Sequence, residues 1–195
     1  KINAATLYPH EIVHKYMERY YKPLDPSLEA LWKNLPDLVD NDETTLVVAD
    51  GSGSMTSVVG RDSSVTALDV ANGLALYFAQ RAKGPFKNTY ITFSETPQLV
   101  RVGSGSLYED LRIARKHDEV ANTNIEATFD LILNTAVQNK MKQEDLPKNI
   151  LIISDMEFDE GCTCSSDKTY YGYRRNPVRQ SLFDELKQRF ESYGY

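Results

Sequence analysis

The residues with the clearest chemical potential form the run Asp50-Gly-Ser52-Gly-Ser54, directly after the apolar stretch 46–49. One carboxylate and two hydroxyls alternate with glycines, so a tight turn can bring all three oxygens to one side. Hard divalent cations such as Mg²⁺ bind oxygen ligands in near-octahedral geometry and keep several waters. The two glycines let the backbone pass close to an ion, because they carry no Cβ. The spacing therefore predicts a loop that binds a divalent cation.

Two later segments offer further oxygen ligands. Thr123 lies in the polar run 121–125, and Asp155 follows the apolar run 149–154. Ligands in open α/β sheets gather outside the carboxyl ends of the strands, so we expect these loops to meet. The expected ligand set is Asp50, Ser52, Ser54, Thr123 and Asp155. A set without sulfur or imidazole suits Mg²⁺ or Mn²⁺, with Ca²⁺ as a further option, better than Zn²⁺.

The elements that must position these loops alternate between strands and helices. Short apolar runs are typical of strands, and a 3.6-residue apolar period is typical of helices. The expected strands are 46–50, 89–93, 99–102 and 149–154. The expected helices that follow the first strand are 65–82, 107–116, 125–142 and 177–193. This order predicts an α/β fold with a Rossmann-like, doubly wound, mostly parallel sheet, one antiparallel edge strand and helices on both faces.

Residues 1–43 precede this pattern and are predicted to form a short N-terminal helical segment. Apolar residues recur at helical spacing over 9–21, and a second helix is expected at 26–34. Residues 44–195 are then expected to form the α/β domain. The chain ends just after a helix, so this domain is expected to lack its last strands.

The composition is that of a globular domain. The 195 residues are 41% hydrophobic and 26% charged, so a substantial core is expected and disorder is not the default. No apolar run approaches the roughly 20 residues that cross a bilayer, so no membrane partner is expected. The formal net charge of −6 argues against broad electrostatic binding to nucleic acid.

The two cysteines, Cys162 and Cys164, are poorly spaced for an ordinary disulfide bond, and no cleavable leader is visible. We therefore expect a cytoplasmic monomer. The chain begins at Lys1 without a methionine, so we expect it to be processed or to come from a longer protein.

Three motifs resemble the von Willebrand factor A domain and its metal-ion-dependent adhesion site. They are the run 47–55 with Asp-x-Ser-x-Ser, the run 122–124, and the run 151–155. The resemblance covers about Leu46 to Tyr195. It is closest to the C-terminal domain of an intracellular family of unknown function, on the runs 8–13, 91–97 and 154–160. The module of the Ro RNA-binding autoantigen is similar.

This resemblance implies a non-catalytic, metal-dependent protein-interaction module. It implies that Asp50, Ser52 and Ser54 ring the ion, that Thr123 binds directly or through water, and that Asp155 acts through a bridging water. In the family, an acidic group of a partner protein completes the coordination. The simpler explanation of the two serines is that they cap the following helix.

Another hypothesis, which ranks after the RNA-associated protein described next, is a zinc hydrolase. His10-Glu11-x-x-His14 matches a motif that places two imidazoles and a glutamate base on one helix face. The motif needs a third ligand, and His117 is the only other histidine. Ile12 on the same helix has the character of a packing residue, which favours a structural role.

The second hypothesis is an RNA-associated protein, in which this module assists a neighbouring RNA-binding region. Aromatic and cationic side chains alternate late in the chain, a composition that can stack on bases and hold phosphates. The candidate contacts are Tyr170, Tyr171, Tyr173, Arg174 and Arg175. A surface loop whose tyrosines pack on the domain is the simpler interpretation of this stretch.

Overall fold

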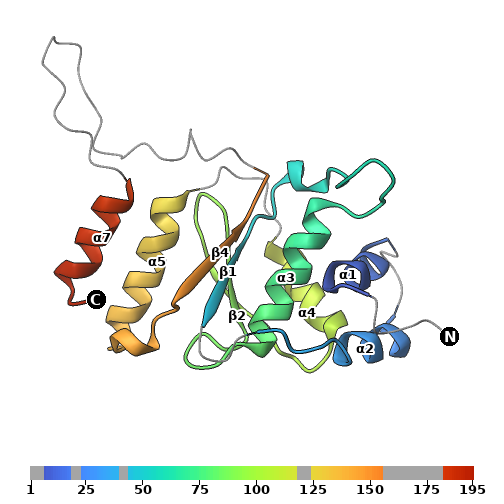
Figure 1. Ribbon diagram of the computed structural model, residues 1–195, viewed down its shortest axis with the longest axis horizontal. Helices are drawn as coiled ribbons and strands as arrows, with labels where there is room; N and C mark the ends of the chain where they lie inside the picture. The colour runs from blue at the N-terminus through green and yellow to red at the C-terminus, as the bar shows by residue number, and fades with distance from the viewer. Residues whose placement is uncertain (1–6, 19–22, 40–43, 118–123, 156–181) are drawn as a thin grey trace, which may run out of the picture.

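The computed structural model describes residues 7–18, 23–39, 44–117, 124–155 and 182–195 (Figure 1). Its centre is a four-stranded sheet in the order β3-β2-β1-β4. The strands are β1 (Thr45–Ala49), β2 (Thr89–Thr92), β3 (Leu99–Arg101) and β4 (Asn149–Ile153). β1 pairs in parallel with both β2 and β4, whereas β2 and β3 are antiparallel. The predicted α/β fold with one antiparallel edge strand is confirmed.

Side chains of β1 alternate between two cores, as the period of two residues along a strand requires. Leu46 and Val48 face the core beneath α5 (Ile125–Gln138) and α7 (Leu182–Ser192). Val47 and Ala49 face the core beneath α3 (Ala67–Arg81) and α4 (Leu107–Ala114). Helices therefore cover both faces of the sheet, which explains why β1 is apolar along its whole length.

The N-terminal helices join the second of these cores. α1 (Pro9–Met17) and α2 (Pro26–Lys33) place Ile12, Val13 and Trp32 in the cluster that also contains residues of α3 and α4. Figure 1 shows both helices on the same side of the sheet as α3. The predicted N-terminal helices are therefore present, and they pack directly on the α/β sheet unit.

Gly73 is the point of closest approach between α1 and α3. A Cβ at this position would lie 2.9 Å from both the Cα and the backbone nitrogen of His10. Carbon atoms this close repel strongly, so only glycine allows the observed helix separation.

Several helix boundaries differ from the sequence-based expectation. The helix expected at 9–21 ends at Met17, and the helix expected at 107–116 ends at Ala114, where a 3₁₀ turn follows. The helix predicted to run to residue 142 ends at Gln138, because Lys140 adopts a left-handed backbone with φ 52°. The Met141 amide then donates to the Ala136 carbonyl at 2.9 Å, which closes the helix end. α3 begins at Ala67, because Thr66 caps it by accepting a hydrogen bond from the Asp69 amide.

No helix in the described part of the chain is both long and apolar enough to cross a membrane.

The close contact at Gly73 gives a stability prediction. Alanine alone favours a helix interior over glycine by up to about 1 kcal/mol, but overpacking a tight contact costs about 1–3 kcal/mol. We expect Gly73→Ala to lower the free energy of unfolding by about 1–2 kcal/mol in urea denaturation. Asn134→Ala, on the exposed face of α5, serves as control and is expected to stay within about 0.5 kcal/mol of the native chain. An unchanged or higher stability of Gly73→Ala would show that α1 does not need this close approach.

Candidate metal-binding site

The parallel pairing of β1 with β4 brings two acidic segments together. Ala49 lies opposite Ile153, and the Asp50 amide extends the ladder by donating to the Ile153 carbonyl at 3.0 Å. Asp50 and Asp155 therefore leave the sheet at the same edge, just beyond the carboxyl ends of neighbouring strands. This is the edge at which α/β sheets bind ligands.

The loop after β1 folds back on the Asp50 carboxylate. The Ser52 amide donates to Asp50 Oδ1 at 2.8 Å, which forms a tight turn of the kind that aspartate favours. The 3₁₀ helix η2 (Gly53–Thr56) follows, and its Met55 side chain is buried in the core. Packing of Met55 in the core thus fixes the position of the loop, while the polar side chains of the loop remain at the sheet edge.

Hydroxyl groups link the two acidic residues into one cluster. Ser52 Oγ lies 3.1 Å from Ser54 Oγ, and Ser54 Oγ donates to Asp155 Oδ1 at 3.0 Å. Ser154 Oγ donates to Asp50 Oδ2 at 2.5 Å. All the predicted ligands except Thr123 are therefore neighbours in the structure, and Thr123 lies outside the described residues.

The serines do not cap the turn that follows them. Ser52 occupies the N-cap position of η2, yet its side chain makes no capping hydrogen bond. The next helix, α3, is capped by Thr66. The capping interpretation therefore does not describe what these two hydroxyls contact.

Asp50 is an unusual buried carboxylate. Only 1% of its surface is exposed, and it forms no ion pair within the described residues. Two other buried carboxylates have more contacts: Asp69 Oδ2 contacts His14 and accepts the Thr66 amide and hydroxyl, although Asp69 Oδ1 has no partner among the described residues. Asp110 accepts hydrogen bonds from the amides of Gly103 and Ser104 and from Gln80. A buried negative charge is costly unless a cation or several donors offset it. Asp50 has the fewest such contacts of the three.

Ser154 belongs to the cluster but was not predicted from the sequence. Its position directly after an apolar strand and before Asp155 was the available signal. Its hydrogen bond to Asp50 becomes visible only when the register of β1 and β4 is known.

The residues of the predicted zinc motif make other contacts. Glu11 caps α1 by accepting the Tyr8 amide at 2.7 Å, and the His10 ring stacks on Tyr8 at 5.7 Å between centroids. Within the described residues, which include all three histidines, no group of three or more His, Cys, Asp and Glu side chains is arranged to hold a metal ion. The zinc hypothesis thus lacks a ligand set in this part of the chain. The cluster around Asp50 is of another type, because hydroxyls supply part of its oxygens.

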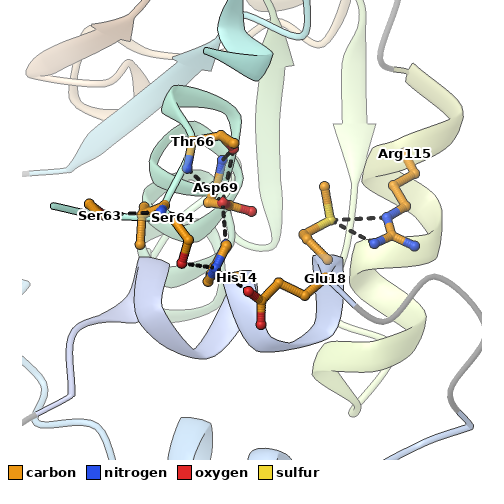
Figure 2. A network of polar contacts seen from close by, with 9 residues as sticks. His14, Glu18, Ser63, Ser64, Thr66, Asp69 and Arg115 are labelled. Atoms are coloured by element: carbon orange, nitrogen blue, oxygen red, sulfur yellow. Dashed lines mark hydrogen bonds and ion pairs between the residues drawn. The ribbon is translucent and has the colours of Figure 1, made fainter. Parts of the chain in front are cut away.

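His14 instead joins α1 to the start of α3 (Figure 2). Its Nδ1 donates to Asp69 Oδ2 at 2.8 Å, and its Nε2 lies 2.9 Å from Ser64 Oγ and 3.0 Å from Glu18 Oε1. Figure 2 shows the ring between Asp69 and these two side chains. Carboxylates face both ring nitrogens, so the arrangement fits a structural hydrogen-bonded contact better than a base, which needs a free nitrogen.

The candidate RNA contacts Tyr170, Tyr171, Tyr173, Arg174 and Arg175 all lie in the stretch 156–181, outside the described residues. Cys162 and Cys164 fall in the same stretch. The RNA hypothesis therefore stays a prediction.

The fold and the site together define an α/β protein with an oxygen-rich cluster at the carboxyl edge of its sheet. The chain belongs to the family described as a domain of unknown function (DUF7788), whose family model matches residues 44–195. It is similar to the uncharacterized protein L728 of Acanthamoeba polyphaga mimivirus, with 29% identity over 180 residues. The match covers 90% of this chain but only 30% of the viral protein. No solved structure gives a significant match.

The contact between His14 and Asp69 can be tested by a double-mutant cycle. Removing one partner of a buried, hydrogen-bonded pair costs about 3–5 kcal/mol, because the other partner is left uncompensated. We expect His14→Ala and Asp69→Ala each to lower the free energy of unfolding by about 2–4 kcal/mol. The double variant is expected to lose at least about 1 kcal/mol less than the sum. Strictly additive losses would show that the two side chains act independently.

Proposed function

We propose that residues 44–195 form a von Willebrand factor A-like domain that binds a divalent cation, Mg²⁺ in the first place, and uses it to recognise a partner protein. The ligands would be Asp50, Ser52, Ser54 and Asp155, together with Thr123 as the sequence predicts. The observation that carries this proposal is the buried Asp50 carboxylate, which has hydroxyl-bearing neighbours and, among the residues that the structure describes, no cationic side chain in contact with it.

The donor set fits a hard cation. Each carboxylate oxygen has two lone pairs, and each Asp50 oxygen accepts one of the hydrogen bonds given above. A lone pair on each therefore remains for an ion. The hydroxyl oxygens of Ser52 and Ser54 can also accept an ion, since a hydroxyl keeps two lone pairs while it donates its hydrogen. Oxygen-only sets of this kind suit Mg²⁺ or Mn²⁺.

The bound ion would supply a concentrated positive charge that attracts a carboxylate from outside. The protein residues hold the site in place: Met55 fixes the loop, and Ser154 orients the Asp50 carboxylate. Ser52, Ser54 and Asp155 lie at the solvent-facing side of the cluster, where a partner can approach. The preferred partner is therefore a protein that presents an aspartate or glutamate side chain.

The mostly parallel sheet and the placement of the loops at its carboxyl edge support this proposal. The family description assigns no activity, so the metal and the partner are our inference from the site.

Metal dependence of stability tests the proposal. A ligand present at 100 times its dissociation constant stabilises the folded state by about 2.7 kcal/mol. For a chain of this size, that corresponds to a rise in the melting temperature (Tm) of roughly 5–10 °C. We expect Mg²⁺ or Mn²⁺ to produce this rise in the native chain but not in Asp50→Asn, which keeps the side-chain shape and loses the charge.

Asp62→Ala is the matched control, because Asp62 is an exposed aspartate in the loop after the cluster. Its response to the ions should equal that of the native chain. An equal rise in Asp50→Asn, or no rise in the native chain at millimolar ion, would remove the basis of the proposal.

A further inference from the structure

A second candidate site lies at the opposite end of α3. A cavity of about 590 Å³ opens between α2, the C-terminal end of α3 and the loop before α4. In Figure 1 α2 and this end of α3 lie at the bottom, whereas the carboxyl end of β1 points to the top. The volume is within the range of about 300–1,000 Å³ that is typical of small-molecule sites.

Arg81 lines this cavity with a guanidinium group that has no close partner among the described residues. Its side chain is only 14% exposed, and it lies over the Tyr77 ring at 4.0 Å from the centroid. Its hydrogen bonds to the Tyr77 and Leu35 carbonyls are both 3.4 Å long, and its Nε is 4.0 Å from Asp37 Oδ1. Charge-assisted hydrogen bonds are usually about 2.7–2.9 Å long. A largely buried cation therefore has only weak contacts with the described residues.

Other polar groups in the wall are already paired. Glu29 accepts the amides of Leu107 and Tyr108, at 2.8 and 3.0 Å, and the Tyr16 hydroxyl at 2.7 Å. Burial, and after it the hydrogen bond to Glu29, raises the pKa of Tyr16 well above its ordinary value, so the hydroxyl stays a donor. The Glu29 charge thus serves the N-terminus of α4 and does not compensate Arg81.

Gln80 is occupied in the same way. It accepts the Trp32 indole N–H and donates to Asp110, both at 2.7 Å. Glu29 and Gln80 are therefore engaged in internal hydrogen bonds, which leaves the other charged side chains of the lining for an incoming molecule.

Three further charged side chains line the cavity. Lys33 and Arg81 are cationic, and Lys33 forms no ion pair with any residue that the structure describes. Asp37 is 58% exposed; its Oδ1 accepts the Val39 amide at 3.2 Å and makes only a long contact with Arg81. The apolar wall is formed by Trp32 and Leu35. The cavity thus combines a planar guanidinium, a second cation and an apolar wall.

We propose that this cavity binds a small organic anion whose carboxylate or phosphate pairs with Arg81. The planar guanidinium can form two parallel hydrogen bonds with either group. Lys33 adds a positive charge, and Trp32 and Leu35 contact the apolar part of the molecule. The exposed carboxylate of Asp37 competes with the bound anion for the Arg81 guanidinium. The site is independent of the proposed metal site.

The single tryptophan of the chain, Trp32, lines the cavity and provides a direct readout. We would titrate the native chain with phenyl phosphate, benzoate and inorganic phosphate, at constant ionic strength and with EDTA present, and follow Trp32 fluorescence. At least one of the two organic anions is expected to give a saturable change. The organic anion that binds more tightly identifies the preferred anionic group. Weaker binding of inorganic phosphate would show that the apolar wall contributes to affinity.

Three variants make the test specific. Arg81→Gln should weaken binding at least tenfold, because the paired cation is lost. Asp37→Asn should strengthen binding several-fold, because the competing carboxylate is lost. Arg112→Gln is the matched control: Arg112 also lies over a tyrosine, Tyr108, but it is exposed and paired with Glu109, so binding should not change.

The proposal is overturned if no probe gives a saturable change, or if Arg81→Gln binds as tightly as the native chain. If Arg81→Gln does not fold, Asp37→Asn decides: binding no tighter than native contradicts the proposal. Asp50→Asn should bind the anion like the native chain, so failure of the metal proposal leaves this result unaffected.

Discussion

The parallel pairing of β1 with β4 is the constraint on which the candidate metal site depends. The register that sets Ala49 opposite Ile153 places Asp50 and Asp155 at one edge of the sheet. Two carboxylates then share a cluster of hydroxyl groups, and one of them, Asp50, is almost fully removed from water. Charges of the same sign repel, and the repulsion is stronger where water is excluded. The divalent cation that we propose would offset the negative charge of both carboxylates.

The N-terminal helices matter to the same region, although the family match begins at residue 44. Gly73 allows α1 to lie against α3, and His14 ties α1 to Asp69 and to Ser64 in the loop that follows the metal-site turn. α3 thus connects three features: the loop with the candidate ligands at its start, α1 along its side, and the cavity lined by Arg81 at its end. Removal of α1 would expose the core residues that Ile12 and Val13 cover. It would also remove the contact between His14 and Ser64.

The sequence predicted the fold well because its signals are local. β1 and β4 are continuous apolar runs, and the alternation of strands and helices is sufficient to predict a parallel sheet. The end of α5 was predicted too late in the chain, because it depends on the left-handed backbone of Lys140. Glycine or asparagine usually occupies such a position, so lysine does not indicate a helix end.

Contacts between distant residues were harder to predict. The Asp-x-Ser-x-Ser loop is visible in the sequence, but the bond from Ser154 to Asp50 needs the strand register. His14 matched a zinc motif along one helix, whereas its partner Asp69 lies 55 residues away on another. Nothing in the sequence marked Arg81 as a site residue, because its weak pairing depends on the residues that surround it in the folded protein.

Crystals grown with Mn²⁺ and measured near the manganese absorption edge test the central claim most directly. The account predicts an anomalous peak within bonding distance of oxygens of Asp50, Ser52 and Ser54 that is absent from Asp50→Asn crystals. No peak at this edge of the sheet, or one coordinated by His10 and His14, would contradict it.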